Sequence, residues 1–190
     1  MVETSAADRL SQAYADMQGG REEKAREAFE RLAREGDLQA EFYLAWMDEN
    51  GWAGPKDETC AAERYRVLAD NGNDLASYHL ASLRFRQGDA ERALPYFLRA
   101  SNSGNASATY WASAIYGGAG GFPANLELEH SYLVRASKLG HMFARRDLAR
   151  QRMQNAKGLS QWILAAFAYW YVKAAGMVFV ARNVNDLRVR

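Results

Sequence analysis

Three histidines and one cysteine are the residues of this chain best suited to bind a metal ion or act as a nucleophile. His79, His130, His141 and Cys60 lie far apart, and none has a partner at the spacing of a metal site. Glu127 shares a predicted helix face with His130, which is typical of a solvated surface pair. A single cysteine excludes an internal disulfide framework, and Cys60 is expected to be a small packing residue. The sequence therefore predicts no metal site, no cofactor and no thiol chemistry.

Phosphate and nucleic-acid binding are also not favoured. The glycine run 117–121 lacks the Gly-Lys-Ser/Thr ending and the preceding strand of a phosphate loop, so we interpret it as a turn. The stretch 145–152 is basic, but phosphate contacts need cations spread along a face, and most of the remaining chain is acidic. No nucleophile motif occurs. We expect a protein that is not an enzyme.

The elements that carry these residues repeat along the chain. Each of four glycines is followed four residues later by an alanine: Gly36 and Ala40, Gly72 and Ala76, Gly104 and Ala108, Gly140 and Ala144. The glycines are 36, 32 and 36 residues apart. A period of this size is typical of an array of stacked supersecondary units.

Further positions repeat with helical spacing. Seven residues before the glycines are the large side chains Phe29, Tyr65, Phe97 and Leu133, and four after the alanines are Leu44, Leu80, Ala112 and Leu148. Offsets of three, four and seven residues indicate helices. Glycine after a helix suits a left-handed cap, because it has no Cβ to clash there. The pattern predicts ten helices near 5–17, 21–35, 38–50, 57–71, 74–86, 89–103, 106–117, 125–139, 142–154 and 160–180.

The pattern resembles a known family. Small residues in the first helix of a unit (Ala40, Leu44, Ala45), an Ala…Tyr…Leu-Ala…Gly second helix and alternating long and short turns are similar to Sel-one-like repeats (SLR), a branch of the tetratricopeptide superfamily. The string 170–175 (Trp-Tyr-Val-Lys-Ala-Ala) also resembles that family's second helix. The likeness covers about residues 20–176. It implies an adaptor or scaffold fold and names no partner.

We therefore predict an all-α protein, a right-handed superhelical solenoid of stacked helix-turn-helix repeats. Residues 1–181 are expected to form one array, with hairpins near 5–36, 38–72, 74–104, 106–140 and 142–180. Residues 182–190 are expected to be a short basic tail. One hairpin cannot bury its apolar face alone, so its neighbours must cover it.

A partner protein or peptide is expected on the concave face, which the first helix of each unit lines if tetratricopeptide geometry transfers. The predicted binding residues are Tyr43, Trp46, Tyr78, His79, Tyr110, Trp111, Arg146 and Arg150. Tyr, Trp and Arg dominate interface hot spots, although aromatic side chains on these helices also pack between layers. The arginines suit a partner with an acidic or carboxylate group.

The segment 162–181 is apolar almost all round and contains one charge, Lys173. It is long enough to span a bilayer, although a central lysine is costly in lipid. Three interpretations stay open: the second helix of the last repeat, a docking surface for another protein or a second copy of the chain, and a membrane anchor or interfacial helix. The expected apolar surface comprises Trp162, Phe167, Trp170 and Phe179.

Charge is divided unevenly. Residues 1–144 contain 15 Lys and Arg against 21 Asp and Glu, a net −6, whereas residues 145–190 contain 9 against 2, a net +7. Such asymmetry suggests that the basic end meets something acidic. The first residues form no secretory signal, so we expect a cytoplasmic protein, with membrane association through 162–181 as the alternative. The predicted function is a protein-interaction scaffold; the alternative is a membrane-associated accessory factor.

Overall fold

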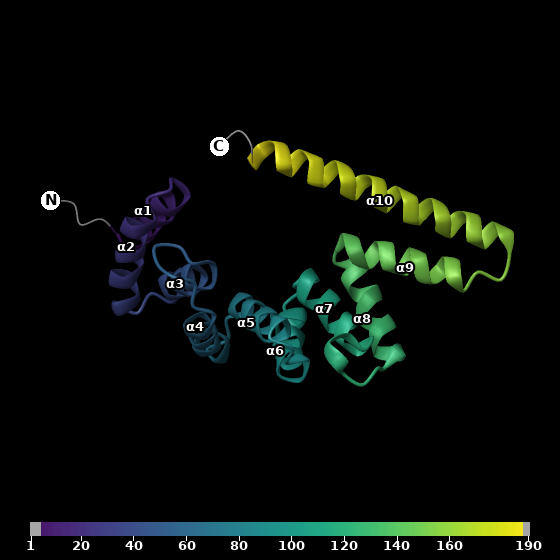
Figure 1. Ribbon diagram of the computed structural model, residues 1–190, viewed down its shortest axis with the longest axis horizontal. Coiled ribbons are helices and arrows are strands. Elements are labelled where there is room, and N and C mark those ends of the chain that lie inside the picture. Colours follow the sequence, from purple (N-terminus) through teal and green to yellow (C-terminus); the bar gives the residue numbers. More distant parts are fainter. Residues whose placement is uncertain (1–4, 188–190) are drawn as a thin grey trace. The chain divides into compact units, whose positions relative to one another are not determined.

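The computed structural model contains ten α-helices and one 3₁₀-helix, and no strand, in residues 5–187, the part of the chain that it describes (Figure 1). Side chains are described for residues 5–176. The helices are α1 (Ala6–Gln18), α2 (Glu22–Arg34), α3 (Leu38–Asn50), α4 (Glu58–Asp70), α5 (Asp74–Arg86), α6 (Ala90–Asn102), α7 (Ala106–Tyr116), η1 (Ala119–Gly121), α8 (Leu126–Lys138), α9 (Met142–Gln154) and α10 (Leu159–Leu187). The predicted all-α class is confirmed, and every predicted boundary except the end of α10 lies within one residue.

Two compact units divide the chain, residues 1–96 and 97–190, and the division falls within α6. In the first unit, helices that follow one another from α1 to α5 pack together. In the second unit the same holds from α7 to α10. We call α1, α3, α5, α7 and α9 the A helices, and the helix that follows each of them its B helix.

The glycine–alanine spacing results from the junction between a B helix and the next A helix. At the end of α2, Gly36 has φ +92°, its N–H donates to Ala33 O, and the N–H of Asp37 donates to Leu32 O. This is the Schellman pattern, which needs a left-handed residue at the glycine position. Asp37 then caps α3, because its carboxylate accepts from the N–H of Ala40 at 3.0 Å.

The other three junctions repeat this geometry. Gly72, Gly104 and Gly140 have φ between +88° and +93°, and the following residues Asn73, Asn105 and His141 accept from the N–H groups of Ala76, Ala108 and Ala144. The repeat alanine is therefore the third residue of α3, α5, α7 and α9. All four of these alanines are fully buried, which explains why the position tolerates only a small side chain.

Alternating large and small residues fill the space between helices. Phe29, Tyr65 and Phe97, the large B-helix residues of the repeat, are fully buried, and the alanines four residues before them are buried as well. Glu129 breaks the alanine pattern in α8 and is half-buried, where its carboxylate accepts from Gln151 Nε2 at 3.2 Å. The predicted core positions are thus confirmed, and the exception is satisfied by a hydrogen bond.

The last helix is longer than predicted. α10 continues to Leu187, so residues 182–187 are helical where we expected a tail; residues 188–190 lie outside the description. No glycine or proline follows Gly176, so no residue there favours a stop. Gly176 does not interrupt the helix; a Cβ there would lie 3.1 Å from Met142 Sδ of α9. The two helices run antiparallel and side by side, with residue 176 beside the start of α9 (Figure 1).

Candidate partner-binding surfaces

In the first unit, the predicted binding residues of α3 are half-buried and belong partly to the core. The Tyr43 ring stacks on Phe29 at a centroid distance of 4.9 Å and also contacts Tyr14. Trp46 packs edge-on against Trp52 at 4.6 Å, so the long turn after α3 folds back over it. Contacts with neighbouring rings therefore hold both side chains in place.

His79 and Tyr78 of α5 lie next to the same cluster. The His79 ring stacks on Tyr65 at 5.0 Å, meets Phe42 edge-on and places Nδ1 3.2 Å from Glu49 Oε2. The Tyr78 ring contacts His79 edge-on. Phe42, which the tetratricopeptide geometry placed on the concave face, is 9% exposed and packs in the core instead.

Glu49 organises a network between α3, α4 and α5. Its carboxylate accepts from Tyr65 Oη at 3.1 Å and from Arg86 Nη2 at 2.9 Å, in addition to its contact with His79. Burial raises the pKa of Glu49, but the hydrogen bonds from His79, Arg86 and Tyr65 outweigh burial and hold the pKa at about 2. The Glu49 carboxylate is therefore ionised at neutral pH, pairs with the Arg86 cation and contacts Nδ1 of His79.

A second network surrounds Asp48, which is nearly fully buried. Its carboxylate accepts from Arg26 Nη2 at 2.6 Å and Arg64 Nε at 3.0 Å, and the Cys60 thiol lies 3.4 Å away. Arg64 also pairs with Glu41. The network joins α2, α3 and α4, and Cys60 is half-buried within it, which agrees with the structural role predicted for that thiol.

In the second unit, Tyr110 of α7 is the centre of the predicted surface. Its hydroxyl donates to Asp147 Oδ2 at 2.9 Å, and its ring stacks on His141 at 4.4 Å. Burial, with the hydrogen bond to Asp147, raises the pKa of Tyr110, so the phenol stays protonated. Trp111 lies beside Tyr110 and is stacked 6.4 Å from Phe97. The ring of Tyr110 is held from two sides by α9.

The two predicted arginines lie on α9. Arg146 pairs with its neighbour Asp147 at 2.9 Å, and its guanidinium lies 5.1 Å from the centre of the exposed Phe143 ring. Arg150 is exposed, and its guanidinium lies 5.8 Å from the Tyr169 ring of α10. The hydrogen bond from Arg150 lowers the pKa of Tyr169, so Arg150 links α9 to α10.

The outer side of α10 is apolar and exposed. Trp162, Phe167 and Trp170, three of the residues of the expected apolar surface, are each exposed to solvent by about half or more. Phe179 falls on α10, but its side chain lies outside the described residues. No helix in the described part of the chain is long and apolar enough to cross a membrane.

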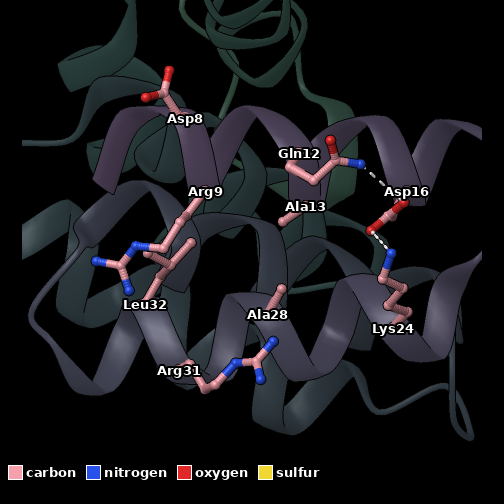
Figure 2. A pocket seen from close by; sticks show the side chains of 9 residues that line it. All are labelled: Asp8, Arg9, Gln12, Ala13, Asp16, Lys24, Ala28, Arg31 and Leu32. Atoms are coloured by element: carbon pink, nitrogen blue, oxygen red, sulfur yellow. Dashed lines mark hydrogen bonds and ion pairs between the residues drawn. The ribbon is translucent and has the colours of Figure 1, made fainter. Parts of the chain in front are cut away.

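The first hairpin contains a groove of about 590 Å³ between α1 and α2 (Figure 2). Its polar groups are paired with one another: Asp16, which is only 2% exposed, accepts from Gln12 and pairs with Lys24 and Arg21, and Arg9 pairs with Glu35. Figure 2 shows the Asp16 carboxylate between Gln12 and Lys24. The hydrogen bonds from Arg21 and Lys24 hold the pKa of Asp16 below its ordinary value. Arg31 of α2 also lines the groove, together with the apolar side chains of Ala13, Ala28 and Leu32.

In the first unit, the structure brings Tyr78 together with His79, and it packs Tyr43 and Trp46 against the same core cluster. In the second unit, it brings together Tyr110, Trp111 and Arg146. Sequence reasoning missed the two carboxylate networks and the capping role of His141. A signal existed for the cap, because the residue after each repeat glycine is Asp, Asn, Asn or His. None existed for Asp48 and Glu49, whose partners are 12 to 37 residues away. Within residues 5–176, no three His, Cys, Asp or Glu side chains are grouped to hold a metal ion.

Solved structures share this architecture. The SLR-fold protective antigen c5321 of uropathogenic Escherichia coli is similar with a TM-score of 0.77 and 20% identity, and a Sel1 repeat protein from Oxalobacter formigenes with 0.76 and 18%. The chain has the SLR fold. The similarity covers 92% of this chain but only 39% of the antigen, and 90% and 74% for the second pair.

A third solved structure is similar to this chain with a lower TM-score. MamA from Desulfovibrio magneticus RS-1, in the form spanning residue 41 to its end, is similar with a TM-score of 0.61 and 16% identity, over 91% of this chain and 96% of that one. No protein-family model matches the sequence, and no curated protein matches it either. The likeness is therefore one of fold, in which the long and short turns alternate as the SLR resemblance implied.

Proposed function

We propose that this SLR-fold chain is an interaction scaffold that holds another protein or peptide on the exposed faces of its A helices. Stacked helical hairpins supply extended surfaces for binding, which suits a scaffold. The proposed function depends on how neighbouring residues hold the A-helix side chains in place.

The observation that carries the proposal is the fixation of Tyr110. Its ring and hydroxyl are both held, by His141 and by Asp147, before any ligand arrives. Immobilising an aromatic anchor in advance removes part of the entropy cost of binding. Arg150, on the same A helix as Asp147, adds an exposed cation whose guanidinium lies 5.8 Å from the Tyr169 ring. A peptide with an aromatic or aliphatic anchor and a carboxylate fits these two groups.

The test is affinity capture from the native cell extract with wild-type chain and a Tyr78→Ala/Trp111→Ala/Arg150→Ala variant. We expect a protein that binds wild type and is lost, by tenfold or more, with the variant, because truncating hot-spot residues costs about 2 kcal/mol each or more.

A matched control carries Val67→Ala, Leu126→Ala and Lys138→Ala, three exposed positions on B helices. Like the test variant it removes one positive charge, and it leaves the A helices untouched, so we expect it to bind like wild type. Equal loss with both triple variants, or no loss with either, would contradict the proposal.

A further inference from the structure

The helix α10 has two apolar sides, and only one is covered. Ala165 is buried and Tyr169, Val172 and Gly176 are half-buried on the side that packs on α9. On the opposite side, large apolar side chains are 42–76% exposed; we call this the α10 outer face, and it comprises Leu159, Ile163, Leu164, Phe167, Trp170 and Tyr171. A helix that is apolar all round is normally buried all round.

The outer face has the spacing of a coiled-coil seam. Ile163, Phe167, Trp170 and Ala174 follow one another at intervals of four, three and four residues, all on the exposed side. In the sequence the same spacing continues with Met177 and Ala181, whose side chains lie outside the described residues. Apolar residues repeating every three and four positions pack as knobs into the holes of a second helix.

We propose that the α10 outer face binds the α10 of a second copy of this chain, antiparallel to it. The large seam residues are in the first half of the helix and the small ones follow Trp170. Parallel pairing would place Trp170 against Trp170 and Ala174 against Ala174, which crowds one layer and leaves a gap in the next. Antiparallel pairing about an axis between these positions places each Trp170 on Ala174 of the partner copy.

The extent of the outer face fits a dimer. A specific interface buries about 800 Å² on each partner, and an aromatic side chain supplies about 150–250 Å² when fully buried. Six large side chains at the stated exposure, three of them aromatic, supply an area of this order.

The charge of the face also favours a second copy. Among residues 159–176 of α10 the only charged side chain is Lys173, which lies beside the seam with its ammonium 4.8 Å from the Trp170 ring. An acidic peptide would find no row of cations along the seam. Helices that lie in membrane interfaces carry Lys and Arg along a polar face, and residues 159–176 of α10 have no such row of cations. An uncharged seam is best matched by an equally uncharged helix.

The pairing is independent of the A-helix binding proposed above, because it uses a different face of the molecule. Light scattering and sedimentation of the full chain, over a range of concentrations, measure it directly. We expect the wild type to have twice the mass of the 21.3 kDa chain. Phe167→Glu should weaken dimerisation at least about 30-fold, because it places a charge in the centre of the seam.

Two further variants test the register. Trp170→Ala and Ala174→Trp should each weaken the dimer, and the double exchange should restore it, because it only swaps which copy supplies the large side chain. Both positions are exposed on α10, so the chains are expected to fold; far-UV circular dichroism verifies this. Leu126→Glu, at a 71% exposed site on α8, is the matched control for Phe167→Glu and should leave the mass unchanged.

Three results would overturn the proposal. The wild-type chain could be a monomer at all concentrations. Both single variants could dissociate and the exchange fail to restore the dimer. A monomeric wild type could instead sediment with phosphatidylserine vesicles in a manner abolished by Phe167→Glu, which would make the outer face a membrane surface.

Discussion

The first and last hairpins of this sequence, α1–α2 and α9–α10, have the same internal plan and opposite surfaces. Both place small residues where the two helices meet, Ala13 and Ala25 in one and Ala149 and Ala165 in the other. The groove of α1–α2 is lined by charges that pair with one another, whereas α10 presents a row of exposed aromatic and aliphatic side chains. Terminal units of repeat arrays usually have a polar outer surface. The two hairpins therefore differ in surface: α1–α2 has charged side chains that pair with one another, and α10 has exposed apolar side chains.

Replacing one phenylalanine by alanine in each hairpin gives the largest contrast. Phe29 of α2 is fully buried, so Phe29→Ala should lower the free energy of unfolding by about 3–5 kcal/mol. Phe167 of α10 is 76% exposed, so Phe167→Ala should change the stability of the monomer by only about 0.5 kcal/mol. Urea unfolding at concentrations that favour the monomer measures both. Similar losses in the two variants would show that α10 is covered within the monomer.

The glycines of the two hairpins should also respond differently. Gly36, after α2, has φ +92°, and a Cβ there costs about 1–2 kcal/mol although nothing lies within 4 Å of it. Gly176 has helical φ, and alanine there gains up to about 1 kcal/mol of helix propensity against a contact with the flexible Met142 side chain. Thermal unfolding should therefore show a clear loss for Gly36→Ala and a smaller change for Gly176→Ala. An equal or larger loss at Gly176 would mean that the α9–α10 contact is rigid.

Mild acid should loosen the last hairpin before the first. Burial lowers the pKa of His141 below its ordinary 6.5, although the charge of Asp147 opposes the shift. The neutral Nδ1 accepts from the N–H of Ala144, and protonation of the ring removes this acceptor. Because the pKa of His141 is lower in the folded than in the unfolded chain, the stabilisation by its cap is complete above pH 6.5 and is lost as the pH falls through the folded pKa. The hydrogen bond from Arg9 keeps the pKa of Glu35 below 4.5, so α1–α2 keeps its contribution until the pH falls below that value.

His141→Asn is the matched variant, because asparagine already caps α5 and α7 at the equivalent positions. The stability of wild type relative to the variant should fall by about 1 kcal/mol or less between pH 7 and pH 5. Amide hydrogen exchange in α9 reports the change locally. A difference that does not depend on pH would show that the histidine does not titrate as a cap.

Local patterns in the sequence were sufficient to predict where the helices lie. The boundaries follow from glycine and cap residues, which act through hydrogen bonds to neighbours three to five positions away, so they can be recognised without tertiary information. The buried positions Phe29, Tyr65 and Phe97 follow from spacing for the same reason. The exposed aromatic character of α10 was also predicted, because no polar face occurs in 162–172.

Tertiary structure decided which neighbours hold each of the predicted binding residues. Tyr43 and His79 have the same residue types as interface anchors, yet their rings pack on Phe29 and Tyr65 from the preceding B helices. Asp48 and Glu49 form their networks only when arginines from other helices approach them. A side chain's exposure depends on neighbours distant in the sequence, whereas helix formation depends on neighbours within one turn; the sequence determined the repeat, and the packing of successive hairpins determined its surfaces.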